Sequence, residues 1–455
     1  MFATDDTIVA VATPTGTGGI GVVRVSGPKA TSIADAILRP CAPLQPRLVT
    51  LKSVFGPGDG RTLDQVLVTF FPSPASYTGE DVLEISGHGS PVLLREIVKA
   101  ALTTGARLAE PGEFTFRAYL NGRLDLVQAE AVGDLVEAVT PLQARVAFDQ
   151  LEGTLTEVVS EIDSTLFDLI ARLEASLDFP DEGYHFVASG TVSGEIRSLV
   201  DRITQLLGEA RQGRLIREGC QVVILGSPNV GKSTLFNQLL GVPRAIVTDI
   251  AGTTRDLLTE TTEIAGIPTT LVDTAGLRKT SDAIEEEGIA RARNALKVSA
   301  LTVLVLDRSV PLCEDDLALL SETIDTPRLV VINKLDLPAC WLLSEVAELE
   351  KTPVINVSLT GQDGARKVRT ELGRLLSHDK GLRDAPTISN IRHIKLLELA
   401  TKALAEAAVA ADLSTDEEFV LSDLQEARLA LEEISGKRTP GAVMEKIFSQ
   451  FCIGK

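Results

Sequence analysis

The sequence predicts a multidomain α/β protein in which an α/β domain is inserted into a helical domain. Three observations indicate this organisation: strand-like runs alternate with turns in the first 119 positions, apolar helical stripes occupy 120–217 and 382–455, and an apolar strand enters a glycine-rich loop near residue 226. We therefore expect an α+β domain at 1–119, a helical domain in two parts at 120–217 and 382–455, and the inserted domain at 218–381. Insertion at an exposed loop is tolerated when the ends of the inserted chain lie close together.

The N-terminal domain is predicted from short apolar runs between turns. An apolar-striped helix is expected at 91–102. Glycines between 16 and 21 superficially match a dinucleotide fingerprint, but their spacing after a strand is wrong and no helix clearly follows. The strand-like runs cover 7–12, 20–25, 66–71 and 81–86.

The helical regions are predicted from apolar residues at helical spacing. A continuous stripe runs from Leu155 to Leu177, and further helices are expected at about 193–217, 391–411 and 420–434. The stripes indicate packing and not a cofactor site.

Composition limits the classes of function. The net charge of −19 argues against a broad basic face for nucleic acid, so any RNA contact must be local or shared with a partner. Five cysteines lack the spacing of a zinc site, and four scattered histidines do not indicate a metal cluster. The sequence shows neither an apolar run of about 18 residues nor a basic stretch leading into an apolar signal core. We expect a cytoplasmic protein with reduced thiols and no membrane span.

The glycine-rich loop has the pattern of a phosphate-binding loop. Gly226-Ser-Pro-Asn-Val-Gly231-Lys232-Ser233 follows an apolar strand and precedes a helix, which is the order that the pattern requires and that a chance glycine-rich turn does not. Backbone N–H groups of such a loop cradle phosphates, Lys232 is expected to reach the β and γ oxygens, and the Ser233 hydroxyl is expected to hold Mg²⁺.

Four further stretches, at 248–256, 271–276, 333–336 and 358–360, predict a guanine-nucleotide site. A carboxylate at Asp336 can accept hydrogen bonds from guanine N1–H and the 2-amino group, an arrangement that adenine does not offer. The segments resemble a Ras-like G domain of the translation-factor-related branch, although such domains usually carry Ser-Ala-Lys where this chain has Ser-Leu-Thr. The expected Mg²⁺ ligands are Ser233 and Thr254. The expected GTP-binding residues are Asn229, Val230, Gly231, Lys232, Ser233, Thr234, Thr248, Asp249, Ile250, Ala251, Gly252, Thr253, Thr254, Asp273, Thr274, Ala275, Gly276, Asn333, Lys334, Asp336, Ser358, Leu359 and Thr360.

One departure within the G domain bears on mechanism. Ras-type enzymes position water with a Gln, and this chain has Leu277 there, which neither donates nor accepts a hydrogen bond. The loop resembles the subgroup in which potassium supplies the positive charge of an arginine finger. Glu285 is expected to position water, although an acidic run such as 285–287 is also typical of a solvated helix start. The expected K⁺ ligands are Asn229, Thr248, Ile250 and Thr253.

Motifs spread over the whole chain carry a more specific resemblance. They lie at 6–14, 76–89, 111–126 and 248–256, with the tail Phe-Ser-Gln-Phe-Cys-Ile-Gly-Lys at 448–455. Together they resemble the MnmE (TrmE) family of tRNA-modification GTPases. The family pattern usually differs at Pro14-Thr15, Thr17, Phe116 and Arg123, where Arg123 keeps the charge of the usual Lys.

The resemblance implies a homodimer joined through a folate-binding N-terminal domain. It implies a 5-formyl- or methylene-tetrahydrofolate carrier and a heterotetramer with the flavoprotein MnmG (GidA). The resemblance also implies a reaction that adds an aminomethyl or carboxymethylaminomethyl group at C5 of the tRNA wobble uridine. It implies that tRNA is held mainly by the partner. By matching motif positions, the folate-binding residues are Arg24, Glu84, Arg123 and Lys455.

Some alternatives remain open from the residues themselves. Without the resemblance, Arg24 and Glu84 are more typical of an ordinary ion pair between strands. Cys452 invites interpretation as a nucleophile, but it has apolar neighbours and no clear His base nearby in the sequence. Two other functions are alternatives: an assembly or ribosome-associated GTPase, which needs a basic RNA-binding domain, and an autonomous folate-dependent transferase with a regulatory GTPase.

Overall fold

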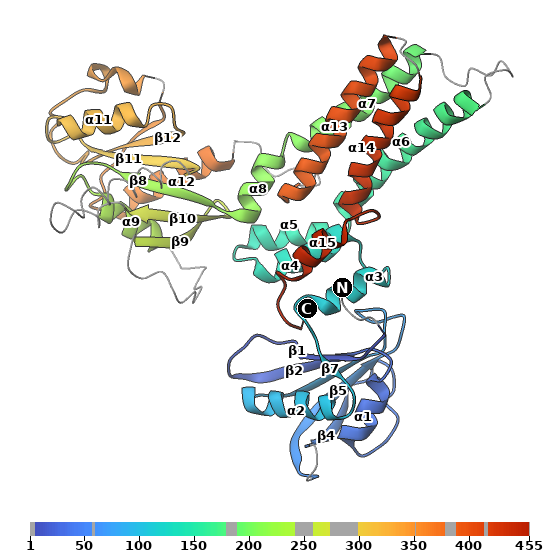
Figure 1. The fold of residues 1–455 in the computed structure, drawn as a ribbon. Helices are drawn as coiled ribbons and strands as arrows, with labels where there is room; N and C mark the ends of the chain where they lie inside the picture. Colours follow the sequence, from blue (N-terminus) through green and yellow to red (C-terminus); the bar gives the residue numbers. More distant parts are fainter. Residues whose placement is uncertain are drawn as a thin grey trace, which may run out of the picture. The chain divides into compact units, whose positions relative to one another are not determined.

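The computed structural model describes residues 5–56, 60–178, 189–241, 258–273, 299–350, 352–377, 388–413 and 417–454 (Figure 1). The chain divides into two compact units. One unit consists of Met1–Gly133, Phe148–Val200 and Leu399–Lys455, and the other of Asp134–Ala147 and Asp201–Glu398. Within the described ranges, every helix is too short or too polar to cross a membrane.

A seven-stranded sheet forms the N-terminal part of the first unit. Its strand order is β3-β4-β5-β6-β2-β1-β7, and all neighbours are antiparallel except β1 and β7. Alternate strand residues such as Val23, Val68 and Ile85 are buried in one core with α1 (Ala30–Ile37) and α2 (Pro91–Thr103). On the other sheet face, Ile8 and Ala10 of β1 form a smaller core with Phe114. The strands are β1 (Ile8–Val11), β2 (Gly18–Ser26), β3 (Leu38–Arg39), β4 (Thr50–Phe55), β5 (Thr62–Phe71), β6 (Val82–Gly89) and β7 (Arg107–Leu108).

Helices before and after the second sheet pack together in the first unit. Helix α6 contacts α14, and Arg428 Nε lies 3.1 Å from Asp163 Oδ1. Because α6 precedes and α14 follows the second sheet in the chain, the inserted arrangement predicted from the sequence is confirmed. The helices between residues 113 and 218 and between residues 391 and 448 are α3 (Glu113–Leu120), α4 (Leu126–Glu137), α5 (Pro141–Leu151), α6 (Thr154–Asp178), α7 (Ser189–Leu207), α8 (Ala210–Glu218), α13 (Ile391–Asp412), α14 (Glu417–Ser435) and α15 (Gly441–Phe448).

The helix expected at about 193–217 is two helices. Helix α7 ends at Leu207 and α8 begins at Ala210. Gly208 lies at the break, where its missing side chain and backbone freedom disfavour continuation of the helix. The apolar stripe continues on both sides of the break, so the pattern alone predicted one helix.

The second sheet belongs to the second unit. Its order is β13-β12-β11-β8-β10-β9, with all neighbours parallel except β9 and β10. The carboxyl ends of the parallel strands meet at one edge, where ligands bind in open α/β sheets. The strands are β8 (Cys220–Leu225), β9 (Leu258–Ile264), β10 (Ile267–Asp273), β11 (Leu301–Asp307), β12 (Arg328–Asn333) and β13 (Val354–Asn356).

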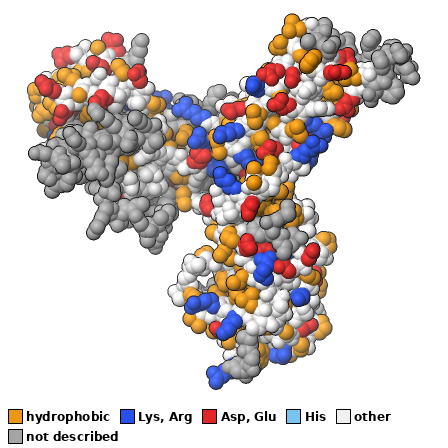
Figure 2. Space-filling model, in the orientation of Figure 1, with side chains coloured by type: hydrophobic (Ala, Val, Ile, Leu, Met, Phe, Trp, Pro, Cys, Tyr) orange, Lys and Arg blue, Asp and Glu red, His pale blue; other side chains and the backbone are white. Residues whose placement is uncertain are grey.

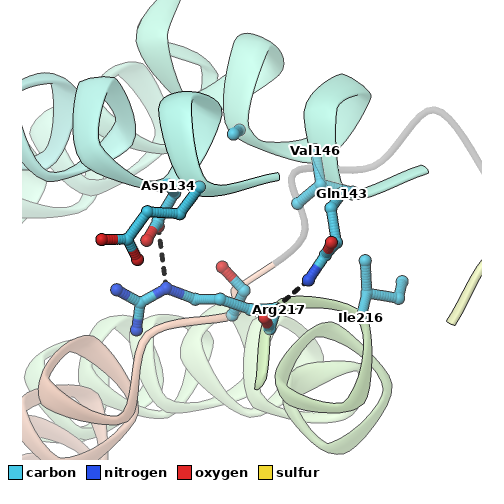
Figure 3. Close-up of a pocket in the computed structure, with 8 residues that line it drawn as sticks. Asp134, Gln143, Val146, Ile216 and Arg217 are labelled. Atoms are coloured by element: carbon cyan, nitrogen blue, oxygen red, sulfur yellow. Dashed lines mark hydrogen bonds and ion pairs between the residues drawn. The ribbon is translucent and has the colours of Figure 1, made fainter. Parts of the chain in front are cut away.

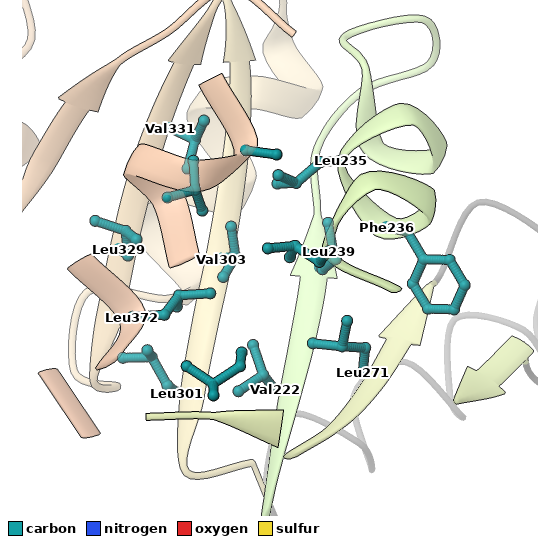
Figure 4. Close-up of a cluster of buried hydrophobic side chains, with 14 of the residues drawn as sticks. Val222, Leu235, Phe236, Leu239, Leu271, Leu301, Val303, Leu329, Val331 and Leu372 are labelled. Atoms are coloured by element: carbon teal, nitrogen blue, oxygen red, sulfur yellow. The ribbon is translucent and has the colours of Figure 1, made fainter. Parts of the chain in front are cut away.

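Apolar cores on both faces of this sheet hold its helices. Figure 4 shows one core, in which Leu235 and Leu239 of α9 (Lys232–Leu240) face Leu271 and Val303 of the strands, and α12 (Gln362–Ser377) adds Leu372. The other core includes residues of α11 (Glu314–Glu322) and η4 (Ala347–Leu349), near η3 (Leu343–Glu345). Burial on both faces explains why these strands read as nearly continuous apolar runs.

Helix α8, which leads into β8, is held by Asp134–Ala147, the part of α4 and α5 that belongs to the same unit. Arg217 Nε lies 2.7 Å from Asp134 Oδ2, and Gln143 Nε2 donates to the backbone oxygen of Arg217 at 2.9 Å (Figure 3). These residues line a small pocket. Val146 and Ile216 belong to the core of the second sheet, so this segment packs as part of the sheet's own domain.

Candidate functional sites

The predicted phosphate-binding loop joins β8 to α9. Gly231 has a φ of +109°, and a Cβ atom there would lie 2.4 Å from Asn333 Nδ2, so the position requires glycine. Lys232 begins α9 and donates its buried Nζ to the backbone oxygen of Ser227 at 2.8 Å. The loop is therefore closed on itself by the lysine that was predicted to reach the phosphates. Thr234 is exposed in the first turn of α9, whose N-terminus favours anions.

Oxygen ligands for a divalent ion meet at the same edge of the sheet. Ser233 donates its hydroxyl to Asp273 Oδ2 at 3.2 Å, and Asp273 ends β10 directly beside Ile224 of β8. The carboxylate is 2% exposed. Hydroxyl and carboxylate oxygens are the ligands that Mg²⁺ prefers, so these residues fit the predicted ion.

Asn333 joins three of the predicted stretches. Its Nδ2 donates to the backbone oxygen of Val230 at 2.8 Å, and its Oδ1 accepts from the N–H of Leu359 at 3.1 Å. The side chain is 4% exposed and uses both its donor and its acceptor. The end of β12, the phosphate-binding loop and the segment after β13 are thus held in one constellation.

Lys334 follows Asn333 in a left-handed conformation, with a φ of +63°. Its Nζ lies 2.5 Å from Oδ2 of Asp307, at the end of the neighbouring strand β11. Burial opposes ionisation of Asp307, but hydrogen bonds from Lys334 and Ser309 outweigh it and lower the pKa of this carboxyl. The pair fixes the direction in which the chain leaves β12.

Asp336 and the Ser-Leu-Thr segment form the rim of the site. Ser358 donates its hydroxyl to Asp336 Oδ1 at 2.5 Å and lies 2.8 Å from Thr360 Oγ1. Asp336 and Thr360 are exposed and Ser358 is half-buried, as expected of groups at the rim of a site rather than in a core. Sequence reasoning placed Ser358 near the base but missed its bond to Asp336.

Several predicted positions lie outside the described residues. They are Thr248, Asp249, Ile250, Ala251, Gly252, Thr253, Thr254, Thr274, Ala275, Gly276, Leu277, Glu285 and Lys455.

In the N-terminal domain, Arg24 and Glu84 lie directly opposite each other on β2 and β6. Arg24 Nε and Nη2 lie 3.0 Å and 2.9 Å from Glu84 Oε1. The guanidinium carbon lies 5.1 Å from the ring centre of Tyr77 and 5.7 Å from that of Phe114, within the range of cation–π attraction. Burial raises the pKa of Tyr77 and keeps its phenol neutral. The two rings were not predicted, because nothing in their local sequence marks them.

The C-terminal tail reaches the same pair. Arg24 Nη1 donates to the backbone oxygen of Gly454 at 3.4 Å, although the two residues are 430 positions apart. Phe448 supports the tail by packing against Phe116, with ring centres 5.1 Å apart. Arg123 is exposed near Gly79, and within the described ranges its side chain makes no hydrogen bond or ion pair with Arg24 or Glu84.

Two family profiles match the chain. The profile described as GTP-binding protein TrmE N-terminus matches residues 7–123, and that described as MnmE helical domain matches residues 126–452. The second range contains the whole sheet from β8 to β13, as expected when that domain is inserted into the helical one.

The chain is also similar over its whole length to curated proteins named tRNA modification GTPase MnmE. It is 41% identical over 455 residues to the protein of Koribacter versatilis, which covers 99% of both chains. It is 43% identical over 456 residues to that of Azoarcus sp., which covers 99% of this chain and 98% of the relative. Among solved structures, the G domain of the T. maritima FeoB iron transporter is 26% identical, covers 34% of this chain and 98% of that chain, and gives a TM-score of 0.27.

Proposed function

This chain belongs to the MnmE family of tRNA modification GTPases, and from that premise we propose that it couples GTP hydrolysis to a folate-dependent modification of tRNA. In this proposal it acts in the cytoplasm with the flavoprotein MnmG. It uses 5-formyl- or methylene-tetrahydrofolate to place an aminomethyl or carboxymethylaminomethyl group at C5 of the wobble uridine. The observation that carries the nucleotide part is Asn333, which holds the loop at Val230 and the segment at Leu359 together.

We propose that the lysine of the loop changes partner when GTP binds. Lys232 donates to the Ser227 carbonyl in the present structure, and the β and γ oxygens of GTP offer it a stronger, charged acceptor. Ser233 and Thr254 would hold Mg²⁺, with Asp273 beside the metal through its contact with Ser233. When bound, the ion neutralises charge that develops between the β- and γ-phosphates.

We further propose a monovalent cation site beside the loop. Asn229 is exposed, with a φ of +62°. In this proposal its amide oxygen, Thr253 and the backbone carbonyls around Thr248 and Ile250 are the ligands. These donors are neutral oxygens, which suit a potassium ion better than a divalent one. When bound, the ion supplies positive charge at the phosphates. Since Leu277 cannot hold water, Glu285 is proposed to position it.

The folate proposal rests on the pair at the sheet face. Arg24 contacts only Oε1 of Glu84, and no described residue donates to Oε2. That oxygen is available for N–H groups of a pterin ring, while Tyr77 and Phe114 provide aromatic surface beside Arg24. Lys455, next to Gly454, and Arg123 are proposed to meet the carboxylates of the glutamyl tail.

We propose that the protein is a homodimer and forms a heterotetramer with MnmG. Leu51 and Leu67 are directly paired on β4 and β5, on the sheet face opposite the helices, and they are 63% and 48% exposed. Exposed paired apolar side chains on a sheet are suited to an interface.

In the view of Figure 2, acidic and basic side chains are interspersed over the described surface. With a net charge of −19, this supports binding of tRNA mainly through the partner.

Turnover of GTP in potassium, sodium and caesium salts at equal ionic strength tests this function. The wild type is expected to be fast in potassium and at least about tenfold slower in sodium, whose smaller radius suits a tighter cage. Asn229→Ala is expected to lose the potassium effect, and Glu285→Ala to lose turnover while still binding nucleotide. Glu286→Ala removes a neighbouring charge of the same acidic run and serves as the matched control.

Two outcomes would contradict different parts of this proposal. Equal rates of GTP turnover by the wild type in all three salts would contradict the proposed cation site. An undiminished rate for Glu285→Ala would remove the role of that residue and leave the cation site in place.

A further inference from the structure

A buried carboxylate outside the nucleotide-binding motifs contacts the phosphate-binding loop. Asp316 lies in the first turn of α11 and is 5% exposed. Its Oδ1 accepts a hydrogen bond of 2.6 Å from the hydroxyl of Ser227, the second residue of the loop pattern. The contact joins residues 89 positions apart, and none of the stretches that predicted the nucleotide site contains Asp316.

The second oxygen of this carboxylate is fixed by its own helix. Asp316 Oδ2 accepts from the backbone N–H of Cys313 at 3.1 Å and from the Cys313 thiol at 3.2 Å. This is a capping box at the N-terminus of α11, where the helix dipole favours a negative charge. With both oxygens engaged, Asp316 cannot turn away from the loop without leaving donors unpaired.

Ser227 connects this carboxylate to the phosphate-binding lysine. Its hydroxyl donates to Asp316, while its backbone oxygen accepts from Lys232 Nζ. Ser227 and Lys232 are 7% and 8% exposed, so the chain of hydrogen bonds is shielded from water. In a buried site each hydrogen bond is stronger, and a missing partner is more costly, than in water. The position of the Ser227 peptide, and with it the start of the loop, depends on where Asp316 holds the hydroxyl.

We propose that Asp316 is a positioning residue of the nucleotide site, which holds the start of the phosphate-binding loop through Ser227 in the conformation that receives phosphates. This inference rests on the proposed binding of GTP and deepens it. Simple electrostatics gives the opposite expectation: a carboxylate near the loop repels phosphates, so its removal would tighten nucleotide binding. The two accounts therefore differ in the sign of the effect.

A double-mutant cycle on the full chain tests the inference. The affinity for the fluorescent probe mant-GDP, with Mg²⁺, is measured for the wild type, Asp316→Ala, Ser227→Ala and the double variant. Each single change is expected to raise Kd about tenfold, as for a lost hydrogen bond to a charged group. The double variant is expected to bind mant-GDP no more weakly than the worse single variant, because both changes break the same hydrogen bond.

The control is Glu314→Gln, which removes a charge from the same helical turn without contact to the loop. Its Kd is expected to stay within about twofold of the wild type, because exposed charges interact weakly through water. In steady-state hydrolysis, Asp316→Ala is expected to raise KM more than it lowers kcat, because the loop binds phosphates in both the ground and the transition state. A merely structural defect would lower the folded fraction and kcat instead.

Ser227→Ala decides the matter if Asp316→Ala does not fold, since it leaves the cap of α11 intact. Unchanged or tighter mant-GDP binding by Ser227→Ala, or additive losses in the double variant, would overturn the role of Asp316. If the wild type itself fails to bind mant-GDP, the proposed GTP site is wrong, and the inference that rests on it falls as well.

Discussion

Ser358 donates its hydroxyl to Oδ1 of Asp336 at 2.5 Å, joining the segments that follow β12 and β13. This hydrogen bond lowers the pKa of Asp336 and keeps the carboxyl ionised, and so acceptor-only, at neutral pH. Oδ2 takes no part in the contact. The rim of the site therefore presents an oriented carboxylate oxygen, which is the group that recognition of guanine requires.

Asp336→Asn is expected to exchange base specificity. The amide offers a donor where guanine also offers N–H donors, so affinity for GTP should fall by roughly a hundredfold or more and affinity for xanthosine triphosphate should rise. Competition titrations against mant-GDP measure both affinities. Asp325→Asn, an exposed Asp of the same domain, is the matched control. Unchanged GTP affinity in Asp336→Asn would show that Asp336 does not contact the base.

Local patterns predicted the elements of the site, but not the bonds between them. Gly231 and Lys232 were found because strand, loop and helix follow one another in the chain. Asn333 bonds to Val230 and Leu359 at separations of 103 and 26 residues, and these pairings depend on strand order, which spacing along the chain does not encode. Asp316 was missed for the same reason.

The N-terminal site shows the same limit more clearly. The apolar runs of β2 and β6 were predicted, but the register that places Arg24 opposite Glu84 is set by the whole antiparallel sheet. The hydrogen bond between Arg24 and Gly454 joins the two ends of the chain, and no local sequence pattern indicates it. Among the strands, β4 was missed because its six residues lack a strict alternation of apolar and polar types.

Arg24→Ala is expected to weaken folate binding and to leave GTP turnover intact, because Arg24 lies in the N-terminal domain and the nucleotide residues lie in the inserted domain. Loss of the guanidinium leaves Glu84 unpaired and removes a cation beside Tyr77, so Kd for 5-formyltetrahydrofolate should rise about tenfold or more. Isothermal titration calorimetry measures the affinity. Arg95→Ala on the exposed face of α2 is the control. Equal affinities for Arg24→Ala and the wild type would remove Arg24 from the site.

Asp6→Asn is expected to destabilise the N-terminal domain in a pH-dependent manner. Hydrogen bonds from Arg107 above all, and from Arg117, lower the pKa of Asp6 below its ordinary value of 3.8 despite an opposing effect of burial. A lowered folded-state pKa contributes stability above pH 3.8, and this stability is lost as the pH falls through the folded value. Because Asp6 is partly exposed, the loss at pH 7 should be no more than about 1 kcal/mol.

Urea unfolding of Asp6→Asn and the wild type between pH 3 and pH 7 measures this difference. The two free energies of unfolding should converge as the pH falls below 3.8, the ordinary value for Asp. Asp5→Asn changes an exposed neighbour and is expected to leave the curve unchanged. A difference between Asp6→Asn and the wild type that stays constant down to pH 3 would show that ionisation of Asp6 is not its source.

The wobble position of tRNA reports the proposed function most directly. Nucleosides from a strain whose chromosomal copy of this gene is deleted are separated by thin-layer chromatography, after complementation with the wild type, Lys232→Ala or Arg24→Ala at matched protein levels. We expect the wild type to restore the C5-modified uridine and both variants to leave it unmodified, because one removes the phosphate-binding lysine and the other the proposed folate contact. Modified wobble uridine in the uncomplemented deletion strain, or full restoration by Lys232→Ala, would contradict a function in which GTP hydrolysis drives this modification.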